Sequence, residues 1–187
     1  MINADDWLAL DVVETAVTKM ARMGELAIVH GVCQLWKAGE KDLLRSGRQD
    51  YLNRDMTINH ATVFASRECY QRFGLFRLDF RIAMDYEWLL RMRSSGVEIN
   101  CSPNLLANMS MGGVTDRNYH LQRFEVVRAK MLHVGKIRAL TYYGAGYLKT
   151  TARWVLEQVG LRSIVNYCHR HFSASKRALR PPPPGDS

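Results

Sequence analysis

The chain has 187 residues and a net charge of +8, and 47% of its residues are hydrophobic while 24% are charged. This length and composition predict one soluble globular domain with a substantial core. They argue against a membrane-spanning protein, because no stretch approaches about 18 unbroken apolar residues. Residues 1–6 lack the basic and apolar regions of a secretory signal, so we expect a cytoplasmic protein.

The excess of positive charge lies in the C-terminal part of the chain. Residues 1–116 contain 13 Lys/Arg and 15 Asp/Glu, whereas residues 117–187 contain 13 and 3. This asymmetry favours an anionic partner for the C-terminal part, such as a membrane surface or a nucleic acid.

The four cysteines are far apart and form no CxxC pair. This spacing argues against a zinc site, and a chain of this length does not need a disulfide framework. We expect reduced and mostly buried thiols at Cys33, Cys69, Cys101 and Cys168.

The first third of the chain predicts a helix, a strand and a turn. Apolar residues at helical spacing predict a helix over residues 8–23, which Gly24 ends. The β-branched run at residues 27–32 predicts a buried strand, and residues 37–40 are typical of a turn. The stretch from there to residue 58 carries no clear pattern.

The middle of the chain predicts two helices joined by a loop. Ser66 caps a short helix that ends at Gly74, and residues 75–81 form the loop. A second helix covers residues 85–93 and stops before Gly96.

The last part of the chain predicts strands and then a helical region. Residues 97–101 alternate as a strand that Pro103 breaks, and residues 105–109 are a candidate second strand. Beyond the following loop the pattern is helical to about residue 172, and residues 181–187 form an extended, disordered tail. Together the elements predict an α/β or α+β fold with a helical appendage.

Two adjacent carboxylates lie near the start of the chain, in the sequence Asn3-Ala4-Asp5-Asp6. An acidic pair at a strand end can hold a hard divalent cation through oxygen ligands, and the cation can neutralise a departing diphosphate. The alternative is that Asp5 or Asp6 caps the helix that begins near Leu8.

A third carboxylate, Asp85, lies where a loop enters a helix. Held there by backbone N–H groups and facing a cleft, it can take a proton from a substrate hydroxyl. The alternative is again a helix cap. Glu87 points away from Asp85 on a helix, so we expect it to have a structural role. Gly112 and Gly113 allow the backbone to approach a ligand closely, although a plain loop is the simpler alternative.

The order of these pieces along the chain is more informative than any one piece. The acidic turn at residues 3–7 is followed by Asn-His-Ala-Thr-Val-Phe at 59–64, Phe-Gly-Leu-Phe at 73–76, Asp-Phe-Arg-Ile-Ala-Met-Asp-Tyr at 79–86 and Gly-Gly-Val-Thr at 112–115. This succession, which covers about three-fifths of the chain, resembles the family 2 glycosyltransferases that build bacterial surface polysaccharides.

The resemblance implies a GT-A fold, in which a nucleotide-binding region leads into an acceptor-binding region. A D-x-D-type motif of the family holds Mg²⁺ or Mn²⁺ on the donor diphosphate, and Asn3-Ala4-Asp5 occupies that place here, followed by Asp6. The first acidic position of the motif is replaced by Asn3, which the resemblance places at the nucleotide-sugar donor. The resemblance therefore makes Asp5 the direct metal ligand, with Asp6 beside it at the metal site, where it either supports the metal or contacts the sugar.

The resemblance also implies that Asp85 is the catalytic base and that His60, Met84, Gly112 and Gly113 lie on the acceptor side. The implied reaction is a single inverting displacement. The acceptor hydroxyl loses its proton to Asp85 and attacks the anomeric carbon of the nucleotide sugar. The acceptor would be a saccharide or a lipid-linked saccharide.

On this basis residues 1–116 are the C-terminal part of a GT-A catalytic domain, residues 117–180 a basic helical extension and residues 181–187 a disordered proline-rich tail. The family's nucleobase-binding strand–helix units would precede residue 2, so we expect a truncated chain or one whose start was set too late. The extension predicts either a peripheral helix on an anionic membrane, at the inner face of the plasma membrane, or a helix packed on the domain with a solvated basic face.

Two other functions stay open from the sequence. A non-catalytic remnant would act only as a binding domain. A basic nucleic-acid-binding module would use residues 117–180, but these lack a zinc finger, an aromatic RNP strand pair and a recognisable helix-turn-helix, so no nucleic acid partner is expected.

Overall fold

A computed structural model describes residues 6–110 and 119–144 of the chain. It has a mixed α/β fold, as the sequence predicted. In chain order the elements are β1 (Trp7–Leu8), α1 (Val12–Met20), β2 (Ala27–Lys37), β3 (Glu40–Ser46), the 3-10 turns η1 (Gln49–Tyr51) and η2 (His60–Thr62), β4 (Phe64–Ala65), α2 (Arg67–Phe73), α3 (Met84–Ser94), β5 (Glu98–Ser110) and α5 (Tyr119–His133). Residues 136–144 are also helical.

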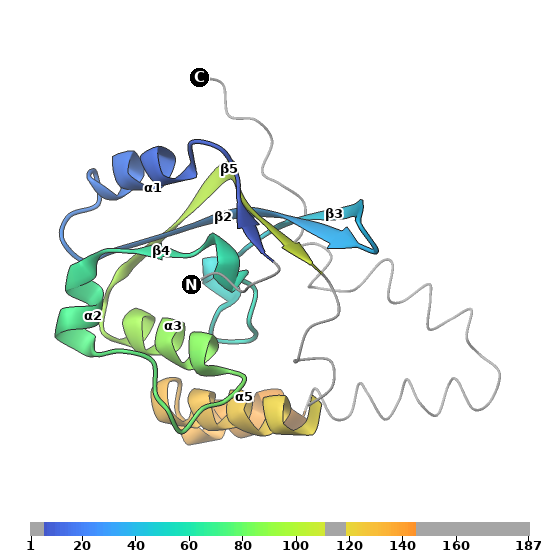
Figure 1. Cartoon of the computed structure of the whole chain (residues 1–187). Helices are drawn as coiled ribbons and strands as arrows, with labels where there is room; N and C mark the ends of the chain where they lie inside the picture. Colours follow the sequence, from blue (N-terminus) through green and yellow to red (C-terminus); the bar gives the residue numbers. More distant parts are fainter. Residues whose placement is uncertain (1–5, 111–118, 145–187) are drawn as a thin grey trace.

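The sheet is mixed and is built around β2. Strand β2 pairs in parallel with β5 and antiparallel with β3 and β4, and β1 pairs antiparallel with β5. Figure 1 shows α1 on one face of this sheet and α3 on the other, with α5 beyond α3. The two faces of β2 are therefore both covered, which explains why its sequence is apolar rather than alternating.

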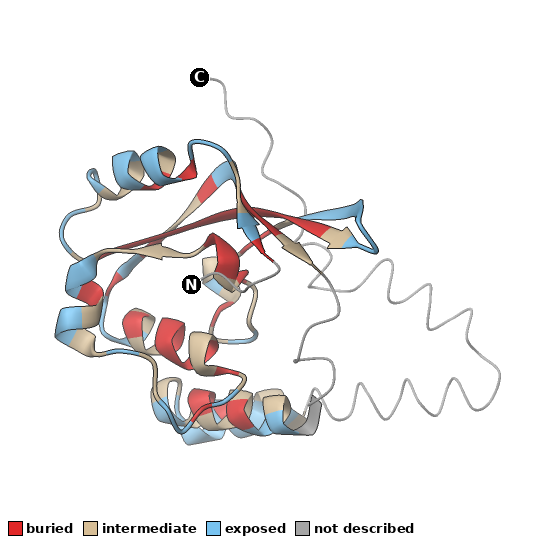
Figure 2. Cartoon of the chain, viewed as in Figure 1, coloured by how far each residue is buried: buried red, intermediate tan, exposed pale blue. Residues whose placement is uncertain are grey.

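Each face of the sheet has its own core because successive side chains of a strand point to opposite faces. Ile28 packs toward α3 and Val29 packs toward α1. Figure 2 shows the buried residues concentrated along β2 and on the helices beneath it. The larger cluster includes Ile28, Leu52, Phe80, Tyr86, Trp88, Leu90, Ile99 and Ala129.

Helix α3 is buried on most of its circumference because it lies between the sheet and α5. Five consecutive residues, 86–90, are buried. Ala129 of α5 is fully buried in the same cluster, with Val126 and Val134 packed against it. The basic helical region predicted for residues 117–180 thus includes a helix that packs on α3.

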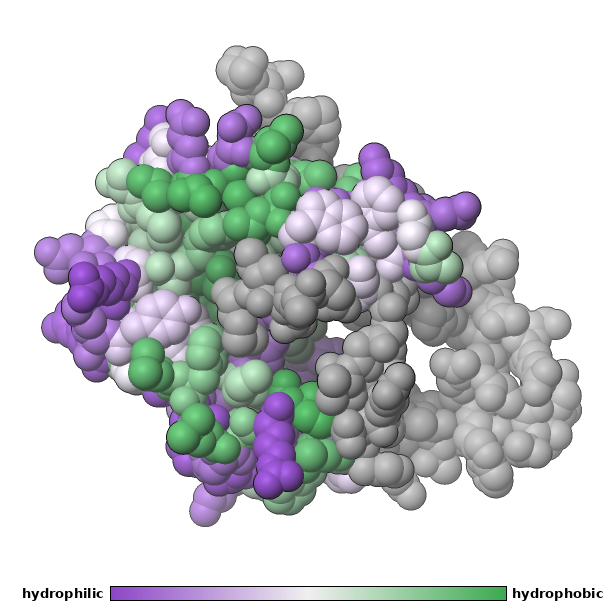
Figure 3. Space-filling model, viewed as in Figure 1, coloured by the Kyte–Doolittle hydropathy of each residue, from purple (hydrophilic) through white to green (hydrophobic). Residues whose placement is uncertain are grey.

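Helix α1 is shorter than predicted, because Leu8 belongs to β1 and pairs with Ala107. Val12 and Ala16 are buried against the sheet, whereas Val13 and Val17 on the next face are more than half exposed. Figure 3 shows hydrophobic side chains gathered over α1 and the neighbouring sheet. Within the part of the chain that the structure describes, no helix is both long and apolar enough to cross a membrane.

The prediction that Pro103 breaks the strand was wrong, since β5 continues through it to Ser110. His30 pairs with Cys101 and Val32 pairs with Leu105, so residues 102–104 lie opposite Gly31 alone. Proline is tolerated in such a bulge because the ladder does not require its missing N–H. The bulge lies so close to β2 that there is no room for a side chain at Gly31. A Cβ on Gly31 would lie 2.9 Å from the carbonyl oxygen of Asn104 and 2.7 Å from the Leu106 side chain.

The predicted turn at residues 37–40 is confirmed, and it opens a hairpin that the sequence did not predict. Ala38 and Gly39 both have positive φ, as the two central residues of a tight hairpin turn require. Strand β3 then pairs with β2, and most of its residues are exposed.

The two predicted middle helices are confirmed at α2 and α3. Ser66 is the N-cap residue of α2, but its side chain makes no cap hydrogen bond and instead accepts from the Ala27 N–H at 3.3 Å. Among the described residues Cys33 and Cys69 are buried and Cys101 is half-buried, and all three are free thiols, as predicted.

Candidate functional site

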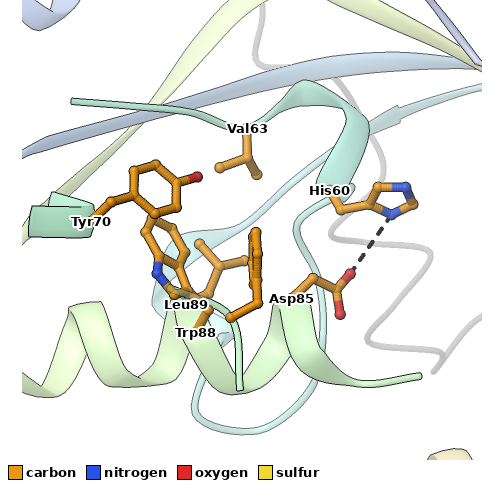
Figure 4. A pocket seen from close by; sticks show the side chains of 7 residues that line it. His60, Val63, Tyr70, Asp85, Trp88 and Leu89 are labelled. Atoms are coloured by element: carbon orange, nitrogen blue, oxygen red, sulfur yellow. Dashed lines mark ion pairs between the residues drawn. The ribbon is translucent and has the colours of Figure 1, made fainter. Parts of the chain in front are cut away.

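Three titratable side chains from separate elements meet at one point of the fold. The Nε2 atom of His60 lies 3.7 Å from Oδ2 of Asp6, and its Nδ1 atom lies 3.7 Å from Oδ2 of Asp85. Figure 4 shows the imidazole of His60 and the carboxylate of Asp85 facing each other at one side of a cavity. Both predicted acidic positions that the structure describes therefore face the same histidine.

Strand pairing places Asp6 at the site. The next residue, Trp7, pairs with Asn108 of β5, and the backbone N–H of Ser110 donates to Oδ1 of Asp6 at 3.3 Å. The Asp6 side chain is 1% exposed. Helix α1 begins only at Val12, with Asp11 as its N-cap, so the alternative that Asp5 or Asp6 caps this helix is wrong.

Asp85 lies in the first turn of α3, and its side chain is 20% exposed. Its Oδ1 accepts a hydrogen bond of 2.7 Å from the N–H of Tyr86, which leaves Oδ2 toward His60. Burial raises the pKa of the Asp85 carboxyl, and the charge of His60 and backbone N–H donors oppose that rise without cancelling it. Ala83 is the N-cap of α3, so Asp85 does not act as the helix cap.

A small cavity of about 20 Å³ lies between His60 and Asp85 on one side and an aromatic wall on the other. Tyr70 stacks on Trp88 with ring centroids 4.7 Å apart, and Phe76 lies 5.7 Å from the same indole ring. Val63 and Leu89 complete the lining. In Figure 4 the Tyr70 and Trp88 rings lie across the cavity from the His60–Asp85 pair, so the space has one titratable end and one apolar end.

The other predicted site residues divide into two groups. Met84 is described: it begins α3 beside Asp85, and its side chain packs against the core cluster. Asn3, Asp5, Gly112 and Gly113 lie outside the described residues.

Glu87 is turned away from Asp85 into the protein. It is fully buried, and its carboxylate contacts Nε2 of His133 at 2.9 Å and the Arg91 guanidinium at 3.1 Å. Because His133 ends α5, this pair ties α5 to α3. The expected structural role matches these contacts.

Another buried carboxylate, Glu125, has no role that the sequence predicts. It is 3% exposed and accepts hydrogen bonds from the backbone directly before α3. The one available signal was that Glu125 is among only three acidic residues in the basic stretch from residue 117 to the end.

Of the two residues predicted to hold a divalent cation, the structure describes only Asp6. Within residues 6–110 and 119–144, no three His, Cys, Asp or Glu side chains are grouped as a metal site. The buried carboxylate of Asp6 nevertheless suits Mg²⁺, because this ion is often held by one or two carboxylates and completed by substrate phosphates and water.

The raised pKa of Asp85 makes stability depend on pH in a definite direction. Between the lower pKa of the unfolded chain, about 3.9, and the higher pKa of the native state, the native protein binds more protons. The free energy of unfolding therefore falls as pH rises across this window, and the full cost of the buried charge remains above it.

We expect Asp85→Asn, which is neutral at every pH, to gain stability relative to the wild type as pH rises. Urea unfolding of both proteins at about pH 4 and about pH 7 measures this difference. A gain that is the same at both pH values would contradict the raised pKa.

Comparison of the chain with protein-family models and with curated proteins finds no match.

Proposed function

We propose that this chain carries the metal side and the acceptor side of an inverting, metal-dependent glycosyltransferase of the GT-A type. The observation that carries the proposal is the meeting of Asp6 and Asp85 on opposite nitrogens of His60, at the mouth of a cavity. These are two carboxylates to which the family resemblance gives different tasks.

Asp85 serves as the general base in this proposal. Its carboxylate takes the proton of an acceptor hydroxyl while the oxygen forms a bond to the anomeric carbon of the donor. The bond from that carbon to the diphosphate breaks in the same step, and the electron pair leaves with the diphosphate. A carboxylate whose pKa is raised by burial is better matched to this proton transfer near neutral pH.

Asp6, together with Asp5, would hold Mg²⁺ or Mn²⁺ on the donor diphosphate. When bound, the cation offsets the negative charge of the departing nucleoside diphosphate. The Ser110 N–H fixes one oxygen of the Asp6 carboxylate, and the other oxygen faces His60.

The surface at the mouth of this small cavity, beside Asp85, is the proposed acceptor site. Aromatic rings such as Tyr70 and Phe76 suit the C–H faces of a sugar ring, and a ring nitrogen of His60 can bind a sugar hydroxyl. The acceptor class is a saccharide, either free or linked to a lipid.

The test measures release of nucleoside diphosphate from a panel of nucleotide sugars, with Mn²⁺ and aryl glycosides as soluble acceptors. It uses this chain and the same chain joined to any in-frame sequence that the gene carries upstream of Met1. Release should require both the acceptor and Mn²⁺, and EDTA should abolish it. Asp6→Asn should raise the Mn²⁺ concentration for half-maximal activity by about 10- to 100-fold.

Asp11→Asn is the matched control, because Asp11 is a nearby exposed acidic residue that adopts positive φ, where asparagine is well tolerated. It should leave the metal requirement unchanged. Turnover that ignores both EDTA and the Asp6 substitution would contradict the proposal.

A further inference from the structure

The backbone that leads into α3 is held by a side chain from another helix. The N-cap residue of α3, Ala83, makes no side-chain cap. Instead the Glu125 carboxylate of α5 accepts three backbone hydrogen bonds of 2.8 Å, from the N–H groups of Arg81, Ile82 and Ala83. Three donors that would otherwise be unsatisfied beside the first helical turn are thereby paired.

Electrostatics favours this contact strongly. Burial by itself raises the pKa of the Glu125 carboxyl, but the three N–H donors and the nearby Arg128 outweigh burial, and the net result is a lowered pKa. The carboxylate is thus charged at neutral pH, next to the positive end of the α3 dipole. Hydrogen bonds to a charged acceptor are also stronger than neutral ones.

A second residue of α5 holds the same loop one turn further along. The Arg128 guanidinium donates to the carbonyl oxygen of Asp79 at 3.1 Å and lies over the Phe80 ring at 4.8 Å. Glu125 and Arg128 together hold residues 79–83, and this segment leads directly into Asp85.

The backbone of α3 determines where the Asp85 carboxylate points. One of its oxygens accepts from the N–H of the following residue, Tyr86, and the other faces His60 at 3.7 Å. A shift of the first turn of α3 would therefore move the carboxylate with it. We propose that Glu125 is a positioning residue, which fixes the backbone before α3 so that Asp85 meets the acceptor hydroxyl. The inference depends on the proposed role of Asp85 as the base.

The experiment compares the wild-type chain with Glu125→Gln, Glu125→Asp and a control. Glutamine keeps the shape but removes the charge and replaces one acceptor oxygen with a donor. Ser94→Ala is the control, because the Ser94 hydroxyl joins the other end of α3 to α5 by donating to the His133 carbonyl at 3.0 Å. It loosens the same pair of helices and leaves the Glu125 contacts in place.

Hydrogen–deuterium exchange provides a measurement that needs no activity. The amides of residues 81–83 should exchange about 10-fold faster or more in Glu125→Gln, and at the wild-type rate in Ser94→Ala. If Glu125→Gln does not fold, Glu125→Asp takes its place, because it keeps the charge and is shorter by one methylene. Wild-type exchange at these amides in a folded Glu125 variant would overturn the inference.

Kinetics then separates positioning from general stabilisation. In Glu125→Gln kcat should fall by about 10-fold or more while the KM for the nucleotide sugar stays constant, and Glu125→Asp should recover part of the loss. Unchanged kcat in a variant that has lost the amide protection would overturn the inference and leave the proposed function standing. If neither this chain nor the chain joined to its in-frame upstream sequence transfers sugar, the proposed function is contradicted, while the exchange rates would still decide whether Glu125 holds this segment.

Discussion

Replacing Asp85 with asparagine is expected to reduce kcat for sugar transfer by about 10²- to 10⁴-fold, with nearly unchanged affinity for the nucleotide sugar. Asparagine has the shape of aspartate and can still accept from the Tyr86 N–H. It cannot take up the proton of an acceptor hydroxyl. Single-turnover kinetics with a saturating donor, together with calorimetric titration of the donor, measure the two quantities separately.

The matched control for this variant is Asp42→Asn. Asp42 is an exposed residue of the hairpin strand β3 and does not line the cavity. It should leave kcat unchanged. Full turnover by Asp85→Asn would rule out Asp85 as the base, and equal losses in both variants would point to a general effect of removing a negative charge.

The largest expected loss of stability follows from Trp88→Ala. The indole is 1% exposed, stacks on Tyr70 with ring centroids 4.7 Å apart and donates from Nε1 to the Gly74 carbonyl at 3.2 Å. Removing it leaves a void between α3 and α2 that the surrounding backbone cannot fully close. We expect the free energy of unfolding to fall by about 3–5 kcal/mol in urea titrations.

Trp7→Ala makes the same chemical change at a partly exposed site. Trp7 is 44% exposed and has one ring neighbour, Trp36, at 5.2 Å. In Trp7→Ala the ring–ring contact should contribute about 1 kcal/mol or less to the fall in the free energy of unfolding, in addition to the contribution of the ring area that becomes exposed. Equal losses at the two tryptophans would contradict the view that the cluster under β2 is the main core.

The helices that the sequence predicted well are those with residues that mark where a helix begins or ends. Ser66 and Gly74 enclose α2, and Gly74 and Gly96 have the positive φ that favours glycine at helix ends. Strand β3 was missed for the opposite reason. It lies at the edge of the sheet, most of its side chains are exposed, and no apolar alternation marks it.

The candidate site was predictable only in part. Asp6, His60 and Asp85 could be named because each belongs to a motif with a recognisable order along the chain. Their mutual geometry could not be derived, since it depends on the pairing of β1 with β5 and on the packing of α3. Glu125 was missed because its partners are backbone N–H groups more than forty positions away, and such contacts leave no residue pattern.

The parallel pairing of β2 with β5 also constrains how the chain folds. Residue 27 pairs with residue 98, so α2 and α3 both lie within the loop that must close before these strands can meet. Closure costs chain entropy before any contact compensates for it, which makes such pairings slow to form. In the described sheet β1 joins only through β5. The position of Asp6 beside His60 therefore depends on β5, through which β1 is attached to the sheet.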